Sequence, residues 1–167
     1  MGLEIRAARP GDAEALLTIQ RRASVDAFAH VFDPERHPYP NGEVLALWTE
    51  TLADPDGEVY VAEVEGEAAG VVSIGNEFLS QLYVLPLLQG NGVGSRLHDH
   101  ALERLRERGV SRAKLWTLEE NGEARRFYER RGWKLTDVTR VVPYPPNPID
   151  VQYAKELSPE IAQTPRR

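Results

Sequence analysis

Three glycines at alternate positions, Gly90, Gly92 and Gly94, are the residues that most suggest chemistry in this sequence. They lie between an apolar run and a segment with helical periodicity. The first amides of a helix have no partners inside the helix and carry the positive end of its dipole, so a junction without side chains lets an anion such as pyrophosphate approach them. The spacing therefore favours a phosphate-binding turn, and a glycine-rich turn without a ligand is the alternative.

Two known phosphate-binding patterns do not fit this turn. A P-loop has a lysine and then a serine or threonine after its second glycine, whereas Gly94 is followed by Ser95 and Arg96. The dinucleotide-binding fingerprint has a third glycine where Ser95 or Leu97 stands here. Basic residues are frequent after the turn, and either a solvated helix face or an anionic ligand would account for them. They are Arg96, Arg104, Arg106, Arg108, Arg112, Lys114, Arg125, Arg126, Arg130 and Arg131.

The histidines lie in less specific surroundings. His30 and His37 belong to a proline-rich loop, and we expect His98 and His100 on the surface of a long helix. No set of histidine, aspartate and glutamate residues has the spacing of metal ligands, and the absence of cysteine excludes disulfides and thiolate ligands. We therefore predict no metal site.

Length and composition are those of one globular domain. With 167 residues, 41% of them hydrophobic, the chain can form one core but is short for two. We predict one domain over residues 1–157 and a flexible tail over residues 158–167. The charged N-terminus and the lack of a long apolar run predict a cytoplasmic protein without a membrane span. The net charge of −6 argues against nucleic acid as a partner, and the sequence leaves open whether the chain forms a homodimer.

Periodicity and capping signals predict seven strands and four helices, in a mixed α/β or α+β arrangement. The predicted strands span residues 3–8, 58–64, 67–75, 77–85, 113–118, 133–142 and 150–157, with a hairpin turn at Glu65 and Gly66. The predicted helices span residues 11–29 with Asp12 as N-cap, 43–52, 92–108, and 121–132 with Asn121 as N-cap. Strict alternation in the strand before the glycines would place Phe78, Ser80, Leu82 and Val84 on one face and Glu77, Leu79, Gln81 and Tyr83 on the other.

Two segments together carry a family resemblance. In LYVLPLLQGNGVGSRL, Gln89, Gly92 and Gly94 match the pattern Q/R-x-x-G-x-G/A. In NGEARRFY, the pattern N-x-x-A-x-x-F-Y is matched by Asn121, Ala124, Phe127 and Tyr128. With these motifs the sequence resembles the GNAT superfamily of acyl-CoA-dependent N-acyltransferases. The resemblance is good over residues 58–134, and the order of elements over residues 3–157 is compatible with it.

The resemblance implies a fold and a cofactor site. The fold would be a GNAT-like single domain, with a central, mostly antiparallel mixed sheet and a splayed pair of parallel strands at the cofactor. Exposed backbone at Leu82 and Val84 would bind the pantetheine arm of acetyl-CoA, and amides from Gln89 to Ser95 would bind its pyrophosphate. The full set of cofactor-binding residues that it implies is Leu82, Tyr83, Val84, Gln89, Gly90, Asn91, Gly92, Val93, Gly94, Ser95, Asn121, Ala124, Phe127 and Tyr128.

The resemblance also implies direct transfer of an acetyl group from acetyl-CoA to a primary amine, with no covalent enzyme intermediate. Tyr128 stands where the family has the tyrosine that protonates the departing thiolate, a task suited to a phenol of pKa about 10. Many members carry a catalytic carboxylate where this sequence has Phe78. Glu77 is adjacent but, by strand alternation, faces the other way unless a bulge turns it. A water relay, or an amine that arrives neutral, would serve instead.

Other functions and the acceptor stay open at this level. A non-catalytic acyl-CoA-binding regulatory module and a nucleotide-binding protein of another fold are the alternatives to an N-acetyltransferase. The resemblance places the acceptor between the loop at residues 28–41 and the loop at residues 141–150. The aromatic residues there suit many small molecules, peptides or protein termini, and they are Phe28, Phe32, Tyr39 and Tyr144.

Overall fold

The structure is a computed structural model that describes residues 2–33 and 35–157, so the predicted tail at 158–167 lies outside the described residues. The strands are β1 (Leu3–Ala7), β2 (Gly57–Val64), β3 (Glu67–Gly75), β4 (Phe78–Val84), β5 (Arg112–Leu118), β6 (Lys134–Val141) and β7 (Ile149–Glu156). The helices are α1 (Ala13–Ala27), α2 (Asn41–Ala53), α3 (Val93–Glu107) and α4 (Gly122–Glu129), with short 3₁₀ turns η1 (Pro10–Asp12) and η2 (Pro86–Leu88).

The seven strands form one sheet in the order β1-β2-β3-β4-β5-β7-β6, in which only the β4–β5 pair is parallel. The turn between β2 and β3 is formed by Glu65 and Gly66, whose φ angles of 52° and 82° are left-handed. The predicted fold class, a mixed α/β domain with a mostly antiparallel seven-stranded sheet and four helices, is confirmed.

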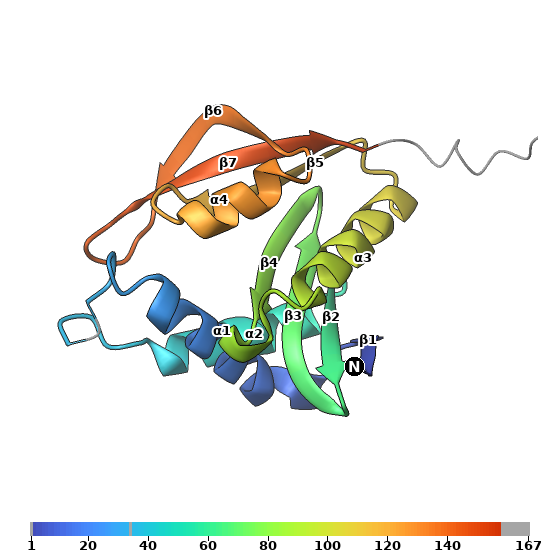
Figure 1. Ribbon diagram of the computed structural model, residues 1–167, viewed down its shortest axis with the longest axis horizontal. Helices are drawn as coiled ribbons and strands as arrows, with labels where there is room; N and C mark the ends of the chain where they lie inside the picture. The colour runs from blue at the N-terminus through green and yellow to red at the C-terminus, as the bar shows by residue number, and fades with distance from the viewer. Residues whose placement is uncertain (1, 34, 158–167) are drawn as a thin grey trace, which may run out of the picture.

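The helices cover both faces of the sheet (Figure 1). On one face, Leu16 and Ile19 of α1 and Trp48 of α2 pack against buried valines of β2 and β3. On the other face, α3 and α4 pack against the sheet, and Leu97 of α3 and Tyr128 of α4 belong to the same core. Because the burial of apolar surface drives this packing, the two helical layers hold the sheet between them.

Strands β4 and β5 diverge, and this divergence creates the space for a site. Their only paired residues are Phe78 and Lys114, where the amide of Lys114 also donates to the carbonyl of Glu77 at 3.0 Å. By contrast, β5 pairs with β7 along its whole length, from Arg112 to Leu118. The ribbon in Figure 1 shows β5, β6, β7 and α4 as one half of the molecule and β1–β4 with α1–α3 as the other. Beyond Phe78, the edge of β4 that faces β5 is therefore not paired with a strand.

A β-bulge in β4 corrects the predicted alternation of its side chains. Opposite β3, Ser73 pairs with Gln81 and Ile74 pairs with Leu79, so Ser80 has no partner. The extra residue shifts the alternation by one position. Leu79 is therefore buried in the same core as Leu82 and Val84, on the face where strict alternation would have placed Ser80, and that prediction is wrong for the first half of the strand.

A second correction concerns His98 in α3. The sequence predicts a surface position for His98, but its side chain is 2% exposed and belongs to the buried face of the helix, so this prediction is wrong. The reason is the position of Trp133, directly before β6. Its indole N–H donates a hydrogen bond to Nε2 of His98 at 3.0 Å, so this ring nitrogen has a partner in the interior. His100 is partly buried against the ring of Tyr60, with ring centroids 4.3 Å apart.

Candidate active site

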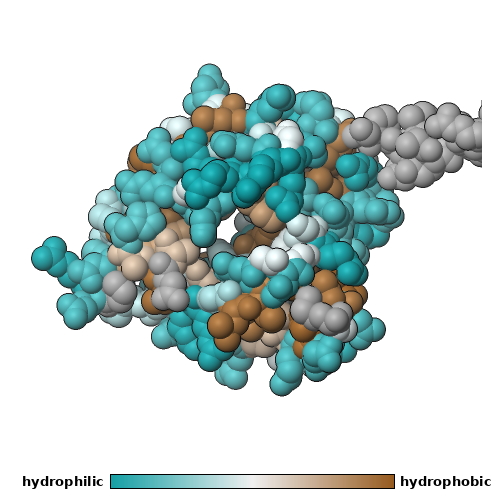
Figure 2. Space-filling model, viewed as in Figure 1, coloured by the Kyte–Doolittle hydropathy of each residue, from teal (hydrophilic) through white to brown (hydrophobic). Residues whose placement is uncertain are grey.

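A cleft of about 1340 Å³ lies where β4 and β5 diverge, and it gathers most of the residues that the two motifs single out. Figure 2 shows it as a hollow in the middle of the face that Figure 1 presents, between α4 and α1. Of the predicted cofactor-binding set, the residues that line the cleft are Leu82, Tyr83, Val84, Gln89, Gly90, Gly92, Gly94, Ser95, Asn121, Ala124, Phe127 and Tyr128. Asn91 and Val93 do not line it, and the side chain of Val93 is fully buried in the core.

The glycine turn forms one end of the cleft. Gly90 and Gly92 have φ angles of 83° and 86°, which L-residues with a side chain rarely adopt, and Gly92 is the N-cap of α3. The amide of Gln89's side chain donates to the carbonyl of Val84 at 3.1 Å and ties the turn to the end of β4. Among the described residues, no side chain caps α3, so the amides of its first turn remain available to an anion in the cleft.

Arginines supply positive charge beside these amides. The guanidinium of Arg131 lies over the ring of Phe127, 3.6 Å from its centroid, and donates to the hydroxyl of Ser95. Arg126 and Arg130 also line the cleft. An anionic ligand at the N-terminus of α3 would therefore meet both amides and guanidinium groups. The cluster of basic residues in the sequence was the signal for this feature.

The open edge of β4 forms the wall between the glycine turn and the pairing with β5. Leu82, Tyr83 and Val84 all line the cleft, and the side chains of Leu82 and Val84 also pack against the core beneath α3. An extended ligand with amide groups can add to such an edge as an extra strand would. The pantetheine arm of CoA is a ligand of this kind.

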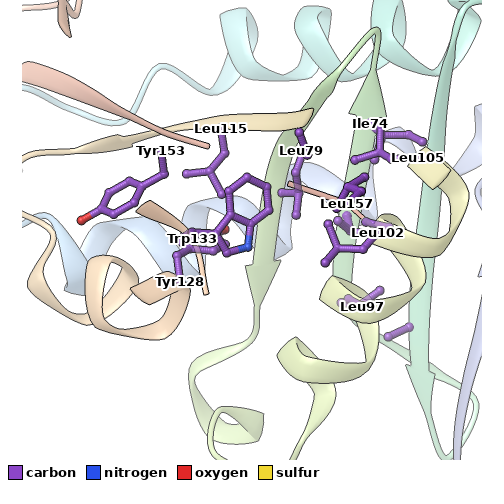
Figure 3. Close-up of a cluster of buried hydrophobic side chains, with 14 of the residues drawn as sticks. Ile74, Leu79, Leu97, Leu102, Leu105, Leu115, Tyr128, Trp133, Tyr153 and Leu157 are labelled. Atoms are coloured by element: carbon purple, nitrogen blue, oxygen red, sulfur yellow. The ribbon is translucent and has the colours of Figure 1, made fainter. Parts of the chain in front are cut away.

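Tyr128 lies on α4 and faces both the core and the cleft. Its ring makes edge contacts with Phe127 and Trp133, with centroids 5.2 Å and 5.9 Å away, and Figure 3 shows it beside Trp133. Burial raises the pKa of Tyr128, and nearby Tyr83 raises it further, so the phenol stays protonated at neutral pH. Within the described residues its hydroxyl has no hydrogen-bond partner, which leaves it free to donate to a ligand.

Asn121 begins the helix that carries Tyr128. Its side-chain oxygen accepts a hydrogen bond from the amide of Ala124 at 3.1 Å, so the predicted N-cap is confirmed. Asn121 also lines the cleft. The second motif thus sets the start of α4 and brings Tyr128 to the cleft two turns later.

A smaller cavity of about 510 Å³ adjoins the cleft, and Ser24, Phe28 and Tyr83 line both. The loop residues predicted to border an acceptor site, Phe28, Phe32, Tyr39 and Tyr144, all line this cavity. His37 lines it as well, whereas His30 does not, because its Nε2 lies 3.3 Å from the carbonyl of Glu120.

Two lining residues of the smaller cavity were missed from the sequence. Ser24 lies inside a helix and has no local motif that points to a site, whereas Asp150 ends the loop at residues 141–150 that was predicted to border the acceptor but was not singled out within it. Only the folding of α1 and β7 toward one another brings them together. A signal for Asp150 would have been a carboxylate at the end of an aromatic and proline-rich loop.

Glu77, the sequence-based candidate for a catalytic base, lines neither cavity. It lies in the turn before β4, and its carboxylate is 3.4 Å from the ammonium group of Lys114. Phe78 next to it is the point where β4 and β5 are paired. Within residues 2–33 and 35–157, no group of three or more metal-binding side chains comes together, and no helix is long and apolar enough to cross a membrane.

The sequence is similar to those of known acetyltransferases. Residues 20–133 match the sequence model of the Acetyltransferase (GNAT) family. An uncharacterized N-acetyltransferase of Archaeoglobus fulgidus is 41% identical over 86 residues, which are 45% of this chain and 58% of that protein. A mycothiol acetyltransferase of Cellulomonas flavigena is 32% identical, over 87% of this chain and 44% of that protein. The chain thus spans about half the length of these two relatives.

A shorter relative and two solved structures match over nearly their whole length. The peptidyl-lysine N-acetyltransferase YjaB of Salmonella typhimurium is 29% identical, over 87% of this chain and 95% of that protein. The apo form of YjaB from Escherichia coli has a TM-score of 0.71 at 26% identity, over 92% of this chain and 97% of that chain. The PaiA N-acetyltransferase of Thermoplasma acidophilum, solved with coenzyme A, shares the fold with a TM-score of 0.74 at 19% identity, over 93% of this chain and 99% of that chain.

The family predicted from the two motifs is therefore confirmed by a match that covers more than half of the chain. The protein belongs to the acetyltransferase (GNAT) family.

Proposed function

We propose that the protein binds acetyl-CoA in the cleft and transfers its acetyl group directly to a primary amine that enters from the smaller cavity. The observation that carries this proposal is the shared wall of the two cavities, formed by Ser24, Phe28 and Tyr83. A donor in one cavity and an acceptor in the other would meet there, beside Tyr128, which lines the larger one. Such positioning of two reactants is the main contribution an enzyme makes to a direct transfer.

The cofactor would be held by groups that the cleft already presents. Its pyrophosphate would accept hydrogen bonds from the amides at the start of α3, next to Gly92 and Ser95, and would be paired with Arg131. Its pantetheine arm would lie along the open edge of β4 at Leu82 and Val84. The thioester would then lie between β4 and α4. The family relative PaiA was solved with coenzyme A, which supports this class of ligand.

In the transfer itself, the neutral amine nitrogen attacks the thioester carbon, so an N–C bond forms and the C–S bond breaks. An amine that arrives as an ammonium ion first loses one proton to water, and the nitrogen loses a second proton to water after the N–C bond has formed. The departing sulfur takes a proton from the hydroxyl of Tyr128, which then recovers one from solvent. The raised pKa of Tyr128 keeps that proton in place until negative charge develops on the sulfur.

Acetyl-CoA binding and turnover test the proposal together. Calorimetry should detect binding, and a hundredfold excess over the dissociation constant should stabilise the fold by about 2.7 kcal/mol. A panel of primary amines should release free CoA, with the acetylated amine identified by mass spectrometry. Binding without turnover on any amine would point to an acyl-CoA-binding regulatory module instead. Stabilisation by NAD or ATP and not by acetyl-CoA would point to a nucleotide-binding protein.

A further inference from the structure

We infer that the smaller cavity is the site of a small-molecule amine with an apolar, aromatic-sized body, and that the carboxylate of Asp150 holds its ammonium group. The inference deepens the proposed function, since it names the class of acceptor. It follows from the polarity of the cavity wall, from the one charged side chain buried in that wall, and from the position of this side chain beside the cofactor cleft.

The wall of the cavity is mainly apolar and aromatic. Phe28 and Phe32 come from the segment after α1, Leu118 from the end of β5, and Tyr144 from the loop before β7. Its volume of about 510 Å³ is in the range of sites that enclose small molecules. Leu47 of α2 also lines the cavity and is 50% exposed, so the apolar wall of the cavity extends to the protein surface. An acceptor with an apolar body would gain free energy from leaving water here.

Asp150 is the buried charge of this wall. Arg36, Glu43 and Asp150 are the charged residues that line the cavity among those described. The side chain of Arg36 is 83% exposed and Glu43 is also exposed, so water screens both, whereas Asp150 is only 8% exposed. The other titratable side chains in the wall, His37 and the tyrosines, carry no negative charge at neutral pH. Asp150 is therefore the buried negative group among the described residues of this wall.

The ion pair with Arg140 holds the carboxylate of Asp150 in place through one oxygen, Oδ2, and leaves the other oxygen for a ligand. The guanidinium Nε–H of Arg140 donates to Oδ2 of Asp150 at 3.0 Å, while the guanidinium carbon lies 4.2 Å from the ring centroid of Trp116. Arg140 does not line the cavity. Oδ1 of Asp150 accepts no hydrogen bond from a side chain in the described part of the chain. A carboxylate oxygen in an apolar wall binds an ammonium group more strongly than water-exposed carboxylates do.

The position of Asp150 links the ammonium group to the proposed transfer. Tyr83 lines both cavities, and Asp150 lines the smaller cavity together with Tyr83. Burial raises the pKa of Tyr83 to about 12, and the negative charge of Asp150 contributes to this rise. Asp150 therefore lies near the shared wall, and an amine held by it would be close to the cleft. The same charge would repel acceptors that carry a carboxylate next to the amine.

Calorimetric titrations without acetyl-CoA test the inference. The three ligands are 2-phenylethylamine, 2-phenylethanol, which has the same body without a positive charge, and phenylalanine, which adds a carboxylate. We expect the amine to bind at least about tenfold more tightly than the alcohol and than phenylalanine, the size of effect of one charged hydrogen bond. Equal binding of amine and alcohol to the unmodified protein would overturn the inference without any variant.

Two variants separate recognition from structure. Asp150→Asn should abolish the preference for the amine over the alcohol. Arg140→Gln breaks the same ion pair but keeps the carboxylate, so it should retain the preference. An equal loss in both variants, or a preference that persists in Asp150→Asn, would show that Asp150 is only structural. Because acetyl-CoA takes no part in these titrations, the inference can fail while acetyl-CoA still binds, and a separate acetyl-CoA titration of each variant reports on the cofactor site.

Discussion

The indole N–H of Trp133 donates a hydrogen bond to Nε2 of His98 at 3.0 Å, in the interior beneath α4. Because Nε2 accepts this bond, the ring proton lies on Nδ1, which is 2.9 Å from a carboxylate oxygen of Asp99. His98 is thereby held neutral in one tautomer, next to the aromatic cluster that contains Tyr128. Burial lowers the pKa of His98, and the hydrogen bond to Asp99 only partly opposes this effect.

This arrangement predicts acid sensitivity. Below about pH 6.5, the ordinary pKa of histidine, the unfolded chain takes up a proton on His98 that the folded chain resists. The contribution of the neutral ring to the free energy of unfolding is thus fully present above that pH and is lost as the pH falls toward the lowered pKa of His98. The total loss is about 1.4 kcal/mol for each pH unit by which folding lowers that pKa. His98→Gln should flatten the pH dependence of urea unfolding in this range. The parallel variant His100→Gln measures the part due to the other histidine of α3, and an unchanged slope in His98→Gln would contradict the prediction.

The charge of the group at position 92 should decide cofactor affinity. A Cβ at Gly92 would meet no atom within 4 Å, and aspartate and asparagine tolerate its left-handed φ of 86° better than other residues. Gly92→Asp should therefore fold but lose acetyl-CoA binding, since it places a negative charge where the pyrophosphate would lie. Gly92→Asn has nearly the same shape without the charge and should bind at least about tenfold more tightly than Gly92→Asp. Calorimetry measures both, and equal affinities would argue against a phosphate at this turn.

Loss of the phenol at position 128 should slow turnover without weakening cofactor binding. Tyr128→Phe should lower kcat by about 10² to 10⁴, the range for a missing general acid, because the hydroxyl acts only when charge appears on sulfur. The affinity for acetyl-CoA should stay within a few-fold. The measurement needs a reactive acceptor and conditions in which chemistry limits the rate. An unchanged kcat would contradict the role of Tyr128 as general acid. It would indicate that water protonates the thiolate and that Tyr128 contributes only to packing.

Substitution by alanine should lower the stability of the fold at Gly70 but not at Gly94. A Cβ at Gly70 of β3 would lie 2.9 Å from Cδ1 of Leu97 and 3.1 Å from the carbonyl oxygen of Tyr83, whereas at Gly94 the nearest atom would be 3.6 Å away, in the ring of Phe127. Gly70→Ala should therefore reduce the free energy of unfolding by about 1–3 kcal/mol. Gly94→Ala is the matched control and should be neutral or slightly stabilising, because alanine favours a helix over glycine. Urea titration compares them, and equal stabilities would show that α3 can move away from β3.

Several features of this protein could be read from the sequence because short segments determine them. The left-handed turn at Glu65 and Gly66 and the N-cap at Asn121 both arise from residues within a few positions of one another. The glycine turn and α3 likewise follow from one continuous segment, and the two motifs were sufficient to predict the family. For each of these, the residues that interact are close in the chain.

The remaining features depend on contacts between distant segments. The bulge that leaves Ser80 unpaired is set by the register of β4 against β3, and the burial of His98 depends on Trp133, 35 residues away. Ser24 carries no local sign of a site, and nothing local distinguishes Asp150 from the rest of the loop at residues 141–150, yet folding brings both to one cavity beside the cleft. Sequence alone determined the order of the elements, the hairpin turn and the N-cap of α4 through short-range hydrogen bonding and periodicity. Only the tertiary structure decided which side chains share a cavity, because packing of the two halves of the sheet brings together residues that no local pattern connects.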